Sequence, residues 1–157
     1  MNVEKAAGII FFRRAKNKIL YLVIRSSRIG PYKYTENGKE KSKSEFWDFP
    51  KGLLEKGEKG EDAALREAKE ETEIENFKML GGFKETVKYF TKRDGKTTLK
   101  FIAMFLAETK TTKIKLSWEH DKYEWLEFKN GYNKISRLEM KTALKKADEF
   151  LQTIQVN

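Results

Sequence analysis

The sequence predicts an α/β (α+β) fold, a mixed β-sheet with helices on both of its faces. Apolar runs near the amino end are almost continuous, which is typical of strands that are covered on both faces. Two segments, Lys59–Glu71 and Leu138–Ile154, space their apolar residues as helices do. The 157 residues contain no internal repeat and no linker, so we expect a single domain, 1–157.

The first elements are two strands, at Lys5–Arg13 and Lys18–Arg25. Asn17 lies in the short turn between them, so the strands should form a hairpin. The polar segment that follows, Ser26–Glu45, predicts a long loop, and loops of this length are usually functional or mobile. Two interpretations of this loop are open. It is a basic surface loop, or its residues Arg28, Lys33 and Tyr34 approach a substrate.

The middle of the chain predicts a helix after an extended approach. Pro50 keeps Phe46–Gly52 extended. The helix Lys59–Glu71 follows, and its alanines allow close packing on a sheet.

The second half predicts another hairpin, a further strand and a terminal helix. A strand within Phe77–Lys92, at 83–92, and a strand at Thr97–Thr109 flank a turn at Asp94 and Gly95. A strand at Tyr123–Phe128 follows. Asn130 and Gly131 are expected to break the chain, and the amphipathic helix Leu138–Ile154 closes it.

Composition excludes several classes of function. There is no cysteine, which excludes disulfides, thiolate catalysis and cysteine zinc sites, and one histidine, which excludes multi-histidine metal sites. No run of 18 apolar residues and no signal peptide is present, so we expect a cytoplasmic protein without a membrane partner. We also expect a monomer. The net charge of +9 indicates a polyanionic partner: a nucleotide, a polyphosphate or RNA.

Three carboxylates stand out on the helix Lys59–Glu71. Glu67, Glu70 and Glu71 fall on one side of a single turn, where like charges repel each other. Folding does not require this arrangement, but Mg²⁺ binding does, because Mg²⁺ takes oxygen ligands from carboxylates, water and substrate phosphate. The alternative is a solvated charged face, in a chain with 36% charged residues.

The spacing around these carboxylates distinguishes the two interpretations. The ordered set Gly52, Glu58, Arg66-Glu67 and Glu70-Glu71 resembles the Nudix box of the Nudix hydrolases. One position departs, since Glu73 stands where that family has glycine. A left-handed Glu73 would cost roughly 1 kcal/mol. We therefore expect the helix to continue and to turn near Asn76.

The resemblance implies an αβα sandwich and roles for the box residues. It implies that Glu58 and Arg66 pair and pin the loop to the helix. It also implies that Mg²⁺ (or Mn²⁺) is held by the carbonyl of Lys51 together with Glu67, Glu70 and Glu71.

Segments outside the box resemble the asymmetrical diadenosine tetraphosphate (Ap4A) hydrolases. They are 6–14, 47–52, 82–84, 116–126 and 139–144. This implies metal-dependent hydrolysis of Ap4A with water to ATP and AMP. Two features depart from the pattern: the loop after Arg25 is longer than in the animal enzymes, and Leu53 replaces a frequent histidine.

Roles for individual residues follow as hypotheses. We expect Glu67 to act as general base, with Glu119 as the alternative. Lysines near the site would meet the polyphosphate charge; the candidates are Lys51, Lys84 and Lys96. Base stacking on an aromatic ring would hold a nucleoside, and the candidates are Tyr89 and Tyr123. His120 would also contact substrate. Without the resemblance, each tyrosine is more often a core aromatic, and Glu119 and His120 are more often surface residues.

Three other functions remain open at this point. A Nudix enzyme could trim RNA 5′ ends, which the positive charge allows. It could also act on nucleoside triphosphates. A third class is a non-catalytic nucleotide or RNA binder on the same scaffold, although a binder has no need to retain repelling glutamates.

Overall fold

A computed structural model describes residues 1–27 and 45–155 of the chain. Its elements, in chain order, are β1 (Asn2–Ala15), β2 (Lys18–Ser26), β3 (Trp47–Asp48), β4 (Lys51–Leu53), α1 (Gly60–Thr72), β5 (Phe77–Met79), β6 (Glu85–Arg93), β7 (Lys96–Thr109), β8 (His120–Leu126), α2 (Phe128–Lys134) and α3 (Leu138–Gln155). Nearly all of the expected loop Ser26–Glu45 lies outside the described residues, including Arg28, Lys33 and Tyr34.

The eight strands form one mixed sheet, as expected. Its main order is β3-β2-β1-β7-β5, while β4 pairs with β1, β6 with β7 and β8 with β2. The long strands β1 and β7 run parallel, from Asn2 opposite Thr98 to Phe12 opposite Glu108, and the other pairs are antiparallel. Both expected hairpins, β1–β2 and β6–β7, are present.

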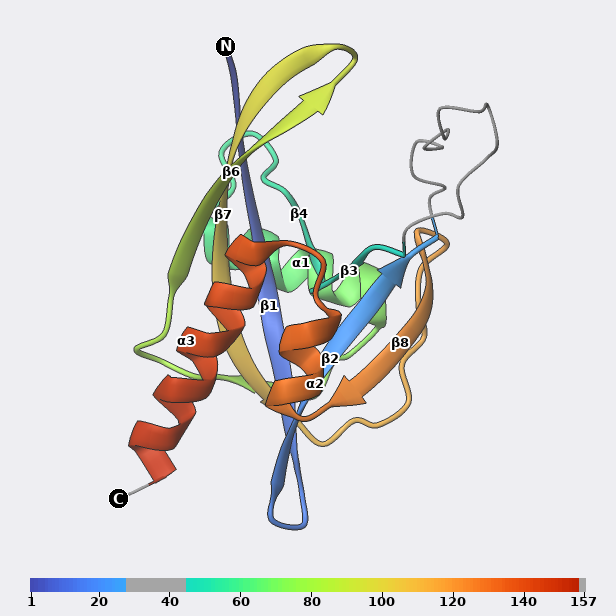
Figure 1. The fold of residues 1–157 in the computed structure, drawn as a ribbon, viewed down its shortest axis with the longest axis vertical. Helices are drawn as coiled ribbons and strands as arrows, with labels where there is room; N and C mark the ends of the chain where they lie inside the picture. The colour runs from blue at the N-terminus through green and yellow to red at the C-terminus, as the bar shows by residue number, and fades with distance from the viewer. Residues whose placement is uncertain (28–44, 156–157) are drawn as a thin grey trace, which may run out of the picture.

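Helices cover both faces of the sheet, so the chain forms an αβα sandwich (Figure 1). Successive strand residues point to opposite faces. In β1, Ile9 and Phe11 pack with the alanines of α1, whereas Ile10 and Phe12 pack with α3. The continuous apolar run in β1 is therefore explained by burial on both sides. No helix in the described part of the chain is long and apolar enough to cross a membrane.

The end of α1 differs from the expectation. The helix does not continue toward Asn76 but ends at Thr72, and Glu73 adopts the left-handed conformation with φ of 55°. The hydroxyl of Thr72 accepts a hydrogen bond from the Ile74 amide at 3.2 Å and donates one to the Ala68 carbonyl at 2.7 Å. Ile74 is fully buried. Its burial and these bonds outweigh the strain at Glu73, which is roughly 1 kcal/mol.

The expected break at Asn130 and Gly131 is also wrong, because both residues lie inside α2. Gly131 is buried there, and a Cβ on it would lie 3.4 Å from the Leu144 side chain. That distance is an ordinary van der Waals contact, so Gly131 is a buried position where α2 packs against α3 and does not end an element. The strand expected at Tyr123–Phe128 also begins earlier, at His120. This shift places His120 on an ordered strand that is paired with β2.

Candidate metal and nucleotide site

The carboxylates of α1 face a cavity of about 400 Å³ near the end of β2. Elements far apart in the sequence supply its walls: β2, the β3–β4 segment, α1, β7 and the start of β8. Its acidic side chains are Asp48, Glu67, Glu71 and Glu119. Its other lining residues are Ile24, Ser26, Phe46, Phe49, Lys51, Gly52, Leu53, Lys100 and His120. The volume lies in the range of small-molecule sites, which is about 300 to 1,000 Å³.

The three box glutamates do not all face this cavity. Glu67 and Glu71 lie one helical turn apart and line it. Glu70 is 57% exposed at its side chain, and its carboxylate lies 3.5 Å from the Arg66 guanidinium. Glu70 lines a separate hollow with Lys69 and Lys115. Two of the three carboxylates are thus within the cavity, and Glu70 stands at its flank.

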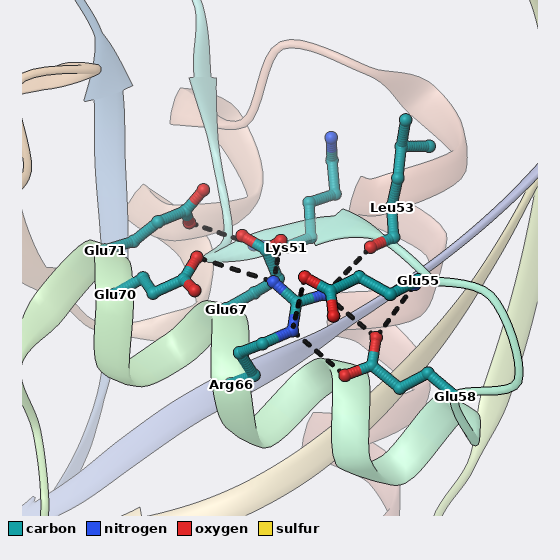
Figure 2. A network of polar contacts seen from close by, with 8 residues as sticks. All are labelled: Lys51, Leu53, Glu55, Glu58, Arg66, Glu67, Glu70 and Glu71. Atoms are coloured by element: carbon teal, nitrogen blue, oxygen red, sulfur yellow. Dashed lines mark hydrogen bonds and ion pairs between the residues drawn. The ribbon is translucent and has the colours of Figure 1, made fainter.

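Arg66, on α1, forms hydrogen bonds with the segment that precedes the helix (Figure 2). Its Nε and Nη2 donate to the two oxygens of Glu58, each at 2.9 Å, and Nη2 also donates to the Leu53 carbonyl at 3.0 Å. These bonds and the Glu55 amide lower the pKa of Glu58 to about 2. The expected pairing of Glu58 and Arg66 is confirmed. Arg66 further donates to Glu67 at 2.8 Å, which fixes that carboxylate beside the cavity.

The backbone of Lys51 and Gly52 holds the glutamates in place. The Lys51 amide donates to one oxygen of Glu71, Oε2, at 3.0 Å. Gly52 lies so close to Glu67 that a Cβ there would overlap its carboxyl group. The Lys51 side chain forms an ion pair with Asp48 at 3.2 Å. Burial acts to lower the pKa of Lys51, but Asp48, Tyr89 and Glu71 together outweigh burial and the pKa is raised.

The cavity is electrostatically suited to a cation. Burial raises the pKa of Glu71 to about 8 against the Lys51 amide bond, and Glu67 and Glu119 add further negative charge. Burial likewise raises the pKa of Glu67. Buried carboxylates with raised pKa values favour either a proton or a positive ion nearby. The oxygens of this set fit a hard divalent cation.

Glu119 and His120 enter the cavity from the start of β8. The Ser117 amide donates to the Glu71 carbonyl at 3.3 Å, which ties this segment to α1. Glu71, Glu119 and His120 each offer a ligand atom, and these atoms lie within 4.8 Å of one another. Burial lowers the pKa of His120, so its imidazole is neutral at neutral pH. The structure thus brings together Lys51, Glu67, Glu71, Glu119 and His120.

The remaining predicted substrate residues do not line the cavity. Lys96 is at the tip of the β6–β7 hairpin, and Lys84 lies 6.0 Å from the Phe105 ring. Tyr89 is only 6% exposed, and the Arg137 guanidinium lies 3.9 Å from its ring centroid. Tyr123 packs into the core on the α1 side of the sheet.

Several lining residues were not anticipated, although the sequence carried signals for two of them. Lys100 shares a face of β7 with Ile102 and Met104, so it interrupts an apolar stripe. Asp48 interrupts a run of aromatic residues in the sequence, between Trp47 and Phe49, and the structure buries all three side chains. Phe46, 38% exposed, carried no such signal.

Comparisons with known proteins agree with this geometry. The family model described as NUDIX domain matches residues 3–146. The asymmetrical bis(5′-nucleosyl)-tetraphosphatase of Mus musculus is 30% identical over 94% of this chain and 95% of its own length. The RNA pyrophosphohydrolase of Nitratiruptor sp. is 29% identical over 57% of this chain and 64% of its own length. Among solved structures, a Caenorhabditis elegans Ap4A hydrolase binary complex matches with a TM-score of 0.75 and 28% identity, covering 96% of this chain and 98% of that one.

Proposed function

Since the chain belongs to the Nudix family, we propose that it hydrolyses dinucleoside polyphosphates and cleaves Ap4A with water to ATP and AMP. The observation that carries this proposal is the cavity in which the box carboxylates Glu67 and Glu71 meet Glu119. Support for the substrate comes from the likeness to asymmetrical tetraphosphatases along nearly the whole chain.

The chain's own residues would bind the cation and the phosphates. Glu67 and Glu71 offer oxygens in the cavity, with Glu70 at its flank and the Lys51 carbonyl beside them. Mg²⁺ or Mn²⁺ bound there would neutralise phosphate charge and lower the pKa of water. Phosphoryl transfer depends mainly on positioning and charge stabilisation, so this carboxylate set suits hydrolysis better than simple binding.

Proton removal from the attacking water requires a carboxylate at the cavity wall. We assign this role to Glu67, with Glu119 as the alternative. Glu67 is positioned by Arg66 at 2.8 Å, and burial raises its pKa toward the range useful for a general base. Glu67→Gln and Glu119→Gln should be compared by their pH–rate profiles. The general base is the residue whose replacement abolishes the acidic limb of kcat.

Two lining residues are further proposed contacts for the substrate. Lys100 supplies a cation at the cavity wall, and Phe46, which also lines the cavity, supplies a partly exposed ring. Base stacking on an aromatic ring contributes about 1–3 kcal/mol. Phe46→Ala should therefore raise KM for Ap4A by about tenfold with little change in kcat. Phe90→Ala, on a strand that does not line the cavity, is the matched control.

Product analysis tests the proposal directly. Ap4A, ATP, dGTP and 5′-triphosphate RNA are incubated in parallel with Mg²⁺ in ¹⁸O-labelled water. We expect ATP and AMP from Ap4A, with the highest kcat/KM of the four substrates. Two molecules of ADP per Ap4A would contradict the asymmetrical assignment. A tenfold preference for RNA ends would favour the second candidate function, to which the Nitratiruptor relative points.

A cytoplasmic location and a monomeric state belong to the same proposal. They are tested by cell fractionation and by the mass of the purified protein in solution.

A further inference from the structure

The chain's one histidine stands beside two carboxylates in the cavity. His120 is half-buried, and its ligand atom lies within 4.8 Å of those of Glu71 and Glu119. Its Nδ1 is shielded from solvent and has no hydrogen-bond partner among the residues that the structure describes. Buried polar nitrogens are normally satisfied, so this atom requires a partner that the described residues do not supply.

We propose that Glu71, Glu119 and His120 form a mixed carboxylate–imidazole site for a divalent transition-metal ion. This inference rests on the proposed function in one respect, that the ion serves the same cavity. It differs from the all-oxygen site expected from the box, because an imidazole nitrogen is one of the ligands. Imidazole favours the later transition ions, such as Co²⁺ and Zn²⁺, whereas Mg²⁺ prefers oxygen.

Glu71 is fixed in a way that leaves it able to act as a ligand. The Lys51 amide occupies Oε2 at 3.0 Å, and α1 places the side chain against the cavity with only 5% exposure. Metal-ligating carboxylates commonly carry such an outer hydrogen bond, which orients them. Glu67 differs because Arg66 already donates to it at 2.8 Å.

The segment that bears Glu119 and His120 is also held before any ion binds. The Ser27 amide donates to the Glu119 carbonyl at 2.8 Å, and the Ser27 hydroxyl donates to the Trp118 carbonyl at 2.7 Å. One residue further on, Asp121 receives two hydrogen bonds from the Arg25 guanidinium, each at 2.8 Å. A bidentate pair of this kind fixes orientation as well as distance. The ligands are therefore preorganised, and ion binding orders little additional chain.

A spectroscopic experiment tests the nitrogen ligand without reference to catalysis. Tag-free protein is saturated with Mn²⁺ and studied by electron spin-echo envelope modulation, which detects ¹⁴N bound to the ion. Because the chain has one histidine, an imidazole signal can only come from His120. We expect ¹⁴N modulation typical of bound imidazole in the wild type and none in His120→Gln. Its absence from the Mn²⁺-saturated wild type would overturn the proposal.

Metal titrations measure the selectivity. Loss of a neighbour of a metal ligand weakens binding by about 10–100-fold, and loss of a ligand costs no less. His120→Gln should therefore weaken Co²⁺ binding at least tenfold and Mg²⁺ binding less than threefold. Trp118→Phe, at an adjacent side chain that is 78% exposed, should change neither constant. Equal losses for Co²⁺ and Mg²⁺ in His120→Gln would overturn the selectivity.

Failure of this site and failure of the proposed function give different results. Ap4A hydrolysis by the wild type with Mg²⁺, but no nitrogen signal, removes the imidazole ligand and retains the function. A nitrogen signal without hydrolysis of Ap4A retains the site and removes the function.

Discussion

Replacing Glu71 by glutamine should stabilise the metal-free protein. In the folded chain the pKa of Glu71 is about 8, against an ordinary value of 4.5, because the side chain is buried. The folded state therefore binds more protons between pH 4.5 and pH 8, and stability falls as the pH rises through this window. At pH 7 this difference costs the folded state about 3 kcal/mol of stability, because Glu71 ionises in the unfolded chain but stays largely protonated in the folded chain, and each pKa unit is worth about 1.4 kcal/mol.

Glutamine removes this cost and keeps an oxygen to accept the Lys51 amide. In EDTA at pH 7, Glu71→Gln should be about 3 kcal/mol more stable than the wild type in urea denaturation. The two proteins should converge below pH 4.5, where Glu71 is protonated in both the folded and unfolded states. Glu70→Gln, at the exposed flank, should differ from the wild type by less than about 0.5 kcal/mol.

Saturating Mg²⁺ should reduce or reverse this difference in stability between the two proteins, because the wild type binds the ion more tightly. An EDTA-treated Glu71→Gln that is no more stable than the wild type at pH 7, or that shows the same dependence on pH, would refute the reasoning.

Other predictions follow from the same contacts. Arg66→Ala should lower the free energy of unfolding by about 2 kcal/mol, because Glu58 and Glu67 lose charged donors; an unchanged urea midpoint would speak against it. Gly52→Ala should displace the Glu67 carboxyl group and weaken Mg²⁺ binding at least about tenfold by calorimetry. Gly81→Ala, whose Cβ would meet open space, is its control, and equal affinities in both variants would exclude the effect. Mg²⁺ binding at pH 7 should release close to one proton, mainly from Glu71, in calorimetry across buffers of different ionisation enthalpy; no release would contradict the raised pKa.

The sequence was most informative where the relevant spacing is local. Glu67 and Glu71 are one turn apart on a single helix, so their common wall follows from helix geometry. The pairing of Glu58 with Arg66 also lies within one short segment, and the resemblance to the box named it. The sheet and its hairpins were predictable because apolar alternation and turn residues act over a few positions.

The sequence was less informative where distant segments meet. Lys96 and Lys100 are both lysines of one strand, and only the position of β7 in the sheet decides which of them lines the cavity. The sequence favours Tyr89 as a stacking platform, but in the structure the guanidinium of Arg137, from a distant segment, lies over its ring. At Glu73 a local penalty was correctly recognised, but the burial of Ile74 outweighed it.

One hydrogen bond and one ion pair join the end of β2 to the start of the segment that leads into β3. The Ser26 amide donates to the Phe46 carbonyl at 2.9 Å, and Arg25 joins Glu45 at 3.0 Å. The chain thus leaves the sheet and returns to it at the same point. Loop-closure entropy grows only with the logarithm of length, about 0.6 kcal/mol for each doubling. Residues between these two anchors can therefore be added or removed at little thermodynamic cost to the sandwich, which makes this junction a natural insertion point for engineering a new recognition segment beside the cavity.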